Sequence, residues 1–369
     1  MTMPMGSLNR RQMMALLAAA LPARAIGAQD VPVVDFTGQR IEWIIPFNEG
    51  GGSDVWARFM APLIHRYLPG QPEIVLRNET GGSGTRGANL FASRARSDGT
   101  MVLGTSGSTQ ITYLLRDFRV RFHFDDWDVL MATPTGGAVY IAPELGVRSW
   151  RDAAQLQGQR LRYASMGPAS LDLVPMLAFR MLGFDVRYIF GYTGRSDGLN
   201  AMQQGAANID HQTTAAYLAN VVPQIAAGRA VPLFSWGVLD AQGQEQRDPS
   251  FPDLPTFAEL YERIHGAPPS GPDYDALRVF ATAGFAAQKL LVVPRTTPAA
   301  IQTAWTDAIS AALRDPIYQA LAAERLGAYD TLVGRDAAML ARQATHIDPA
   351  LRKHVLDILA RDYSVRMSD

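Results

Sequence analysis

"IEWIIPFNEGGGSDVWARFM" (residues 41–60) decides the fold, because it joins an apolar segment to three glycines and then to a helical pattern. Residues 41–47 form a short apolar run that is typical of a buried strand, and residues 53–68 carry apolar side chains at helical spacing. Glycine has a high conformational entropy cost on folding and adds no side chain to a core. Three consecutive glycines therefore indicate that bare backbone is needed where the strand meets the helix.

The same alternation of strand and helix continues along the chain and restarts near residue 138. We predict strands at 41–47, 73–78, 101–106, 138–143, 161–167, 185–192, 208–212, 230–237, 278–285 and 290–294. Helices are predicted at 53–68, 85–95, 149–157, 171–183, 196–205 and 215–228, and the chain from residue 298 onward is mainly helical. Residues 240–276 are rich in Pro, Gly and Asp and indicate an irregular excursion. The alternation predicts an α/β protein with parallel sheets.

Composition limits the classes of function. A length of 369 residues favours two domains, and 47% hydrophobic with 19% charged residues is typical of a globular protein. The net charge of −1 gives no reason to expect nucleic acid or an anionic membrane surface as a partner. The absence of cysteine excludes disulfides, thiolate catalysis, zinc–thiolate sites and a lipidated cysteine anchor.

The N-terminal segment 1–28 has the layout of a bacterial export signal. Arg10 and Arg11 precede a short apolar run at 13–21, and small residues follow, with possible cleavage after Ala25 or Ala28. The paired arginines fit either general secretion or twin-arginine export. The alternative is an amphipathic N-terminal helix of the folded protein. We expect a soluble periplasmic protein whose mature chain starts near residues 26–29.

The glycine loop at 47–54 has the properties of an anion site. Ligands of open α/β sheets bind beyond the carboxyl ends of strands. A helix N-terminus offers free N–H groups and partial positive charge, and glycines let this backbone approach an anion. Several other predicted strands, in both halves of the chain, also end in Gly, Ser or Thr. We expect a cleft of neutral donors that holds an anion without a buried counter-charge. The alternatives are a tight turn without a ligand and simple helix capping by each hydroxyl.

Enzyme motifs are weak or missing. Residues 82–87 match G-x-G-x-x-G, but the next strand does not end in the carboxylate that a dinucleotide ribose needs. The six histidines are scattered, and only His211 falls at a predicted strand end that faces the cleft. Asp125, Asp126 and Asp128 are interpreted as a solvated turn. We therefore expect no enzyme activity, no cofactor and no metal.

These segments resemble one family along nearly the whole mature chain. "IIPFNEGGGSDVWARFMAPLI", "VLRNETGGSGTRGANLFASRARSDGTMVLGTS", "LRYASMGPAS", "FGYTGRSDGLNAMQQGAANID", "IAAGRAVPLFSWG", "FPDLPTFAEL" and "LLVVPRTTPAAI" occur in the family's order. The chain is similar to the extracytoplasmic solute receptors of tripartite tricarboxylate transporters, which are called Bug receptors.

The resemblance implies a periplasmic binding protein of type II, with two α/β lobes joined by two crossover strands near 138–143 and 278–285. It implies that lobe 1 contains 29–137 and 286–369, and that lobe 2 contains 138–285. It also implies carboxylate capture between the lobes by backbone N–H groups, hydroxyls and bridging water. The implied ligand-binding residues are Phe47, Asn48, Gly51, Gly52, Ser53, Asp54, Ser106, Ser108, Thr109, Ser165, Met166, Ser170, Tyr192, Gly194 and Arg195.

The chain departs from the family pattern at a few positions. Asn48 and Glu49 replace small apolar residues, and a carboxylate beside an anion site is unfavourable unless it turns away or meets a cation. Thr214 stands where many members have an Asp that meets an amino group, which argues against an amino-acid ligand. Arg195 is either a partner for a second ligand carboxylate or part of a surface ion pair with Asp197.

The resemblance implies a monomeric receptor that closes on a small mono-, di- or tricarboxylate and delivers it to the permease subunits of a tripartite transporter. Micromolar binding requires about −8 kcal/mol. One helix terminus supplies roughly 0.3–1 kcal/mol, so several loops must converge. The alternatives are a sensor that partners a membrane histidine kinase and a nucleotide-dependent enzyme.

Overall fold

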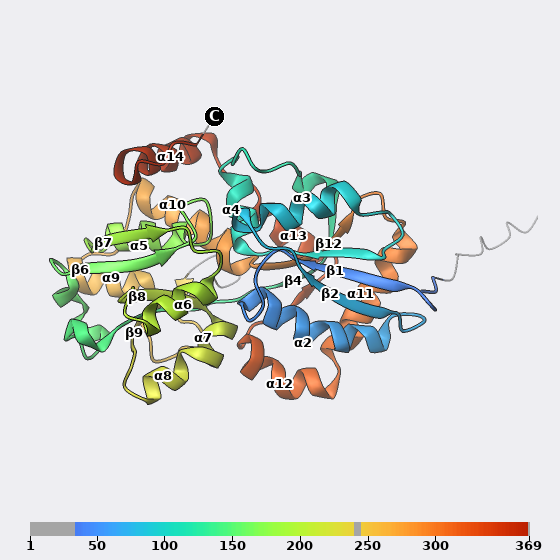
Figure 1. Ribbon diagram of the computed structural model, residues 1–369, viewed down its shortest axis with the longest axis horizontal. Helices are drawn as coiled ribbons and strands as arrows, with labels where there is room; N and C mark the ends of the chain where they lie inside the picture. The colour runs from blue at the N-terminus through green and yellow to red at the C-terminus, as the bar shows by residue number, and fades with distance from the viewer. Residues whose placement is uncertain (1–33, 240–244, 368–369) are drawn as a thin grey trace, which may run out of the picture. The chain divides into compact units, whose positions relative to one another are not determined.

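The computed structural model describes residues 34–239 and 245–367 (Figure 1). The predicted export signal lies outside these residues. The strands are β1 (Arg40–Ile45), β2 (Glu73–Asn78), β3 (Met101–Gly104), β4 (Trp127–Thr133), β5 (Gly137–Ile141), β6 (Arg160–Ser165), β7 (Asp185–Phe190), β8 (Ile209–Thr213), β9 (Val231–Ser235), β10 (Val238–Leu239), β11 (Glu245–Gln246), β12 (Lys289–Pro294) and β13 (Leu332–Val333).

Most predicted helices are confirmed to within a few residues. The helices are α2 (Gly52–Tyr67), α3 (Thr85–Arg94), α4 (Gly107–Leu114), α5 (Leu173–Met181), α6 (Arg195–Gln203), α7 (Thr214–Asn220), α8 (Val222–Ala226), α9 (Phe257–His265), α10 (Pro272–Ala281), α11 (Ala299–Leu313), α12 (Pro316–Leu326), α13 (Arg335–Ala344) and α14 (Pro349–Tyr363). The predicted helix at 149–157 is a 3₁₀ helix, Trp150–Leu156.

Lobe 1, as we use the name, is built on a six-stranded sheet with the order β13-β4-β12-β3-β1-β2. β1 pairs in parallel with β2 and β3, which confirms the prediction for the N-terminal units. β12 runs antiparallel to β3 and β4, so the sheet is mixed and not parallel throughout. The antiparallel pairing involves β12, which follows the whole of lobe 2 in the sequence and so lies outside the alternating N-terminal units.

Alternate side chains of the lobe 1 strands pack against helices on opposite faces of the sheet. Trp43 of β1 packs with residues of α2 and α11, whereas Ile44 belongs to the cluster that includes residues of α3 and α13. Figure 1 shows α3 and α13 on one side of the strands and α2, α11 and α12 on the other. Burial of both faces explains the nearly continuous apolar runs of these strands.

Lobe 2 contains a three-stranded sheet, β8-β5-β9, and the parallel pair β6-β7. The two sets are joined beside β8, because the N–H of Asn208 donates to the carbonyl of Arg162 at 2.9 Å. The region 240–276 was predicted to be irregular, but its described part contains α9 and the start of α10. Thr256 and Glu259 form a capping box at the start of α9, which is the helix signal that this prediction overlooked.

The chain crosses between the lobes at 134–136 and again at 286–288. The two crossings lie side by side, because the N–H of Thr135 donates to the carbonyl of Phe285 at 3.0 Å. The predicted crossover strand at 278–285 is wrong: this segment is the end of α10 and a π-helical turn, Thr282–Ala286. The buried residues of α10 are Ala276, Leu277 and Phe280, which follow a helical spacing. Pro272 stands in the first turn, where a helix tolerates proline.

Two further expectations need correction. The acidic segment is a turn only at Asp125 and Asp126, and Asp128 lies in β4, where its carboxylate accepts a 2.9 Å hydrogen bond from Gln302. The C-terminal helix α14 packs against lobe 2, although residues 286–369 were assigned to lobe 1. Asp362 of α14 pairs with Arg180 of α5 at 2.9 Å.

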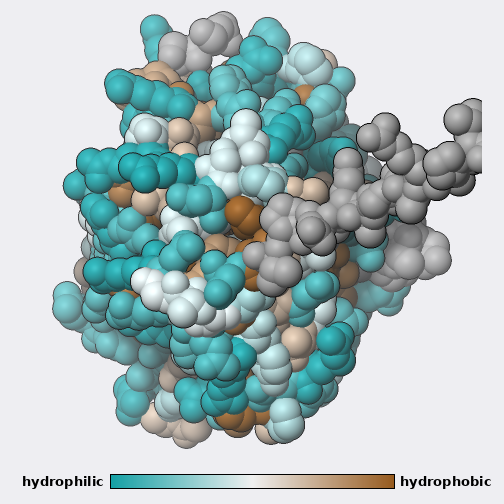
Figure 2. All heavy atoms as spheres, turned by 90° about the vertical axis from the view of Figure 1, so that its right-hand side faces the viewer, coloured by the Kyte–Doolittle hydropathy of each residue, from teal (hydrophilic) through white to brown (hydrophobic). Residues whose placement is uncertain are grey.

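The face of lobe 1 that is turned to the viewer in Figure 2 is mainly hydrophilic where it is coloured. None of the helices in 34–239 and 245–367 combines the length and the apolarity that crossing a membrane requires.

Candidate functional site

The glycine loop leads from β1 directly into α2. Gly51 is the N-cap residue in an extended conformation, and no side chain caps the helix. The carboxylate of Asp54 turns back and accepts a 2.9 Å hydrogen bond from the N–H of Gly50. Arg58 donates to the same carboxylate at 2.8 Å and lies 3.5 Å from Glu49. The first amides of α2 are therefore left for another acceptor, while Asp54 and Arg58 stabilise the loop from behind.

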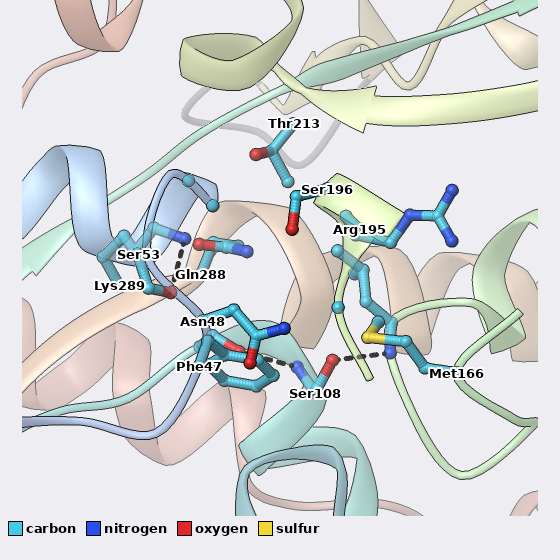
Figure 3. Close-up of a pocket in the computed structure, with 15 residues that line it drawn as sticks. Phe47, Asn48, Ser53, Ser108, Met166, Arg195, Ser196, Thr213, Gln288 and Lys289 are labelled. Atoms are coloured by element: carbon cyan, nitrogen blue, oxygen red, sulfur yellow. Dashed lines mark hydrogen bonds between the residues drawn. The ribbon is translucent and has the colours of Figure 1, made fainter. Parts of the chain in front are cut away.

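A cavity lies directly in front of this loop, between the two lobes (Figure 3). It is lined by Phe47, Asn48, Gly51, Gly52, Ser53, Ser106, Ser108, Met166, Leu171, Gly194, Arg195, Ser196, Thr213, Gln288 and Lys289. The centre of a water molecule has about 40 Å³ in which to move there. The lining contains no carboxylate, so an anion would meet no like charge on the cavity wall.

The lobes contact each other around the cavity. Asn48 donates a 2.9 Å hydrogen bond from Nδ2 to Oγ1 of Thr193. Opposite them, a Cβ on Gly52 would lie 2.5 Å from Oγ1 of Thr213. Such close approach of lobe 1 to lobe 2 on both sides explains the small volume, and it corresponds to a closed arrangement.

Most of the predicted ligand-binding residues come together here. The cavity is lined by Phe47, Asn48, Gly51, Gly52, Ser53, Ser106, Ser108, Met166, Gly194 and Arg195. The other five predicted residues, Asp54, Thr109, Ser165, Ser170 and Tyr192, are not among the lining residues. The polar side chains of Asp54, Thr109, Ser165 and Ser170 bond within the protein: for example, Ser165 donates to Asp172 at 2.9 Å, and Thr109 belongs to the capping box of α4.

Arg195 lines the cavity, but its guanidinium extends away from it (Figure 3). The guanidinium is buried, pairs with Asp210, and lies 3.2 Å from a carboxylate oxygen of Asp172. It also donates to the carbonyl of Ala164 at 2.9 Å. Both readings of Arg195 are therefore wrong in this structure, because the side chain is neither a free partner for a ligand nor at the surface with Asp197. It holds the loops of lobe 2 together.

His211 is fully buried in β8 and does not line the cavity, although it was expected to face the cleft. Tyr163 donates its hydroxyl proton to Asp172 at 3.0 Å, so the same hydroxyl accepts from Nδ1–H of His211 at 2.7 Å. Burial, with the nearby Arg195 charge, holds the pKa of His211 well below its usual value. The imidazole is therefore a neutral part of the lobe 2 core.

Sequence reasoning missed five lining residues: Leu171, Ser196, Thr213, Gln288 and Lys289. Lys289 is 4% exposed and donates to Oγ of Ser53 at 3.1 Å. Its burial lowers the pKa of the ammonium group to about 7. The expectation of a site without a buried cation is therefore wrong. The available signal was a lysine at the start of the apolar run 290–293.

Two of the three glycines in the G-x-G-x-x-G segment, Gly84 and Gly87, are explained by packing against the first loop. A Cβ on Gly84 would lie 2.8 Å from the ring of Phe47, and one on Gly87 would lie 2.8 Å from Cβ of Pro46. Since close packing accounts for these glycines, the segment adds no support for nucleotide binding.

The two α/β lobes with a cavity between them have the fold of two-lobed periplasmic binding proteins. Among solved structures, the chain is similar to the periplasmic binding protein BugD, at 18% identity, 89% and 99% coverage of the two chains and a TM-score of 0.65. It is also similar to Rpa4515 of R. palustris with adipate, at 18% identity, 88% and 98% coverage and a TM-score of 0.66. The resemblance to the Bug receptors is thus confirmed at the level of the fold.

One curated protein is similar to this chain in sequence. The UPF0065 protein in the tcbD-tcbE intergenic region of Pseudomonas sp. (strain P51) is 26% identical over 263 residues, which cover 69% of this chain and 72% of that protein. No protein-family model matches the sequence.

Proposed function

We propose that this chain is a periplasmic receptor of the Bug type, which captures a small organic acid between its lobes and delivers it to a tripartite tricarboxylate-type permease. The observation that carries the proposal is the cavity between the lobes. It combines the uncapped start of α2, several hydroxyl groups and a buried ammonium, and its wall has no carboxylate. The likeness in fold to Rpa4515 with adipate supports an organic acid as the ligand.

Capture works by lobe closure around two crossings that lie side by side. In an open form, the α2 amides and Ser106 on lobe 1 meet the acid first. Closure then brings Thr213 and the α6 start over it and removes water, which strengthens the polar contacts. Ten of the residues predicted from the sequence line the cavity. We propose that they contact the ligand in this closed form.

A thermal-shift screen of the purified protein against mono-, di- and tricarboxylates tests capture. A ligand at 100 times its Kd stabilises the folded state by about 2.7 kcal/mol, which is a shift of several degrees. Failure of every acid to raise the melting temperature would overturn the proposal. The delivery step is tested by deleting the permease: loss of uptake supports delivery, whereas retained ligand-dependent gene induction would favour the sensor function.

A further inference from the structure

The cavity holds a cation without a counter-ion in the protein. Lysine is rarely buried unless it is paired, because desolvation destabilises its charged form. Lys289 is 4% exposed, yet its ammonium contacts the neutral hydroxyl of Ser53, and no described carboxylate lies within 4 Å of it. Only two of the 34 basic residues are lysines, Lys289 and Lys353. An anion that enters the cavity would supply the missing charge.

The neighbouring residue holds an acceptor without a donor. Gln288 is 3% exposed, lines the same cavity, and its Oε1 has no hydrogen-bond partner among the described residues. A buried amide oxygen of this kind normally receives a hydrogen bond from protein, water or ligand. Both Gln288 and Lys289 line the cavity, and in Figure 3 they are drawn on its α2 side.

The start of α2 completes the arrangement. Ser53, which accepts from Lys289, belongs to the first turn of a 16-residue helix whose N-cap, Gly51, has no side-chain cap. The partial positive charge of this helix end adds to the ammonium. One end of the cavity therefore attracts a negative group and also offers a single unpaired acceptor beside it.

We propose that Lys289 is the counter-ion of the ligand carboxylate and that Gln288 accepts a hydrogen bond from a hydroxyl on the adjacent carbon, so that the receptor selects small 2-hydroxy acids. This inference rests on the proposed function. A hydroxyl suits the site better than an ammonium group, because a second cation beside Lys289 would be repelled. The small cavity favours a short acid.

Isothermal titration with matched acid pairs tests the selection. The pairs are lactate and propionate, glycolate and acetate, and malate and succinate, with both enantiomers of the chiral acids. We expect one hydroxy acid to bind about 5- to 150-fold more tightly than its partner, since an unpaired buried acceptor costs about 1–3 kcal/mol. The Gln288→Met variant should lose most of this preference and retain carboxylate binding.

Lys289→Met should weaken both members of the pair at least tenfold and keep the preference between them. Lys353→Met is the control, because Lys353 is exposed and pairs with Asp357 at 2.7 Å, far along the chain in α14. Equal binding of both acids, or wild-type affinity in Lys289→Met, would overturn the inference. If other acids still stabilise the protein, the receptor function survives; if no acid does, both proposals fail.

The pKa of the Lys289 ammonium can be measured directly. A change in this pKa on ligand binding would not be expected if Lys289 served only to stabilise the fold. Lysine labelled with ¹³C at Cε gives two signals, so the pKa of each side chain can be followed by NMR. We expect the Lys289 value to rise from about 7 when the hydroxy acid binds. The other charges near the cavity have fixed partners, Asp54 with Arg58 and Arg195 with Asp172. An unchanged Lys289 value in the saturated protein would contradict a direct ion pair.

Discussion

Ser108, in the first turn of α4, accepts a 2.9 Å hydrogen bond at Oγ from the backbone N–H of Leu171 in lobe 2. The two residues are 63 positions apart and belong to different lobes. Both also line the cavity, so the bond that joins the lobes lies at the edge of the site. Ligand contact and lobe closure therefore depend on some of the same atoms.

Replacing Ser108 by Ala should weaken ligand binding. In an open receptor the N–H of Leu171 can bind water, but in the closed form of the variant it would be buried without a partner, because Leu171 is 2% exposed. The expected penalty of about 1–3 kcal/mol shifts the lobes toward the open form and raises the apparent Kd about 5- to 150-fold. Titration calorimetry measures the affinity, and small-angle scattering measures closure.

Ser93→Ala is the control, since Ser93 is exposed and its hydroxyl bonds only within α3, to the carbonyl of Leu90. Wild-type affinity and full ligand-induced compaction in Ser108→Ala would show that this bond does not contribute to closure.

Gly52→Ala should impair closure without unfolding the protein. The added Cβ would lie 2.5 Å from Oγ1 of Thr213 and 3.7 Å from Nζ of Lys289. Alanine suits the first turn of a helix at least as well as glycine, so the free energy of unfolding should not fall. We expect at least a tenfold loss of affinity, measured by calorimetry, with an unchanged melting temperature for the free protein.

The double variant Gly52→Ala/Thr213→Ala separates steric contact from loss of cavity space. Removal of the Thr213 hydroxyl should recover much of the lost affinity. Thr213→Ala alone completes the cycle, because it measures the change in affinity that loss of the hydroxyl causes by itself. A double variant as weak as Gly52→Ala would argue against the lobe contact as the cause.

The local pattern of the sequence predicted the units that are built from neighbouring segments. The β1–α2 unit and the parallel pairing of β1, β2 and β3 follow from alternating periodicity. The position of α14 on lobe 2 does not, because its packing depends on residues such as Arg180, far away in the sequence. The apolar run at 278–285 predicts a strand but forms a helix, since a run this short has no period that separates a strand from a buried helix.

The site residues likewise fall into two groups, those that a local sequence pattern predicts and those that only long-range packing brings to the cavity. Residues that follow a strand end, such as Asn48, Gly52 and Ser106, could be predicted because the carboxyl edge of a sheet is a known place for ligands. Gln288 and Lys289 enter the cavity from the second crossing, just before and at the start of β12. Only the antiparallel placement of β12 between β3 and β4 brings them there, and no local motif encodes it. The direction of the Arg195 side chain likewise depends on Asp172 and Asp210.

Asp172→Ala should destabilise lobe 2 strongly. The Asp172 carboxylate is fully buried, accepts hydrogen bonds from Tyr163 and the N–H of Met166, and lies 3.2 Å from the Arg195 guanidinium. Removing one partner of a buried ion pair costs about 3–5 kcal/mol. Urea denaturation should show a loss of this size, whereas Asp197→Ala, at a half-buried position that binds Thr193, should lose much less. Equal stability of the two variants would contradict a bracing role for Arg195.

Acid should destabilise the protein through His211. Because burial holds the pKa of His211 well below its usual value of 6.5, the unfolded chain takes up a proton below about pH 6.5 that the folded protein does not. Stability is therefore retained above this pH and falls as the pH decreases, by at most about 1.4 kcal/mol per pH unit for one group. Urea unfolding at pH 7.5 and 5.5 should show a smaller decrease in His211→Asn, whose amide can still donate to Tyr163. The change His123→Asn, at an exposed site, is the control for the loss of one histidine. An equal decrease in the wild type and in His211→Asn would place the acid sensitivity elsewhere.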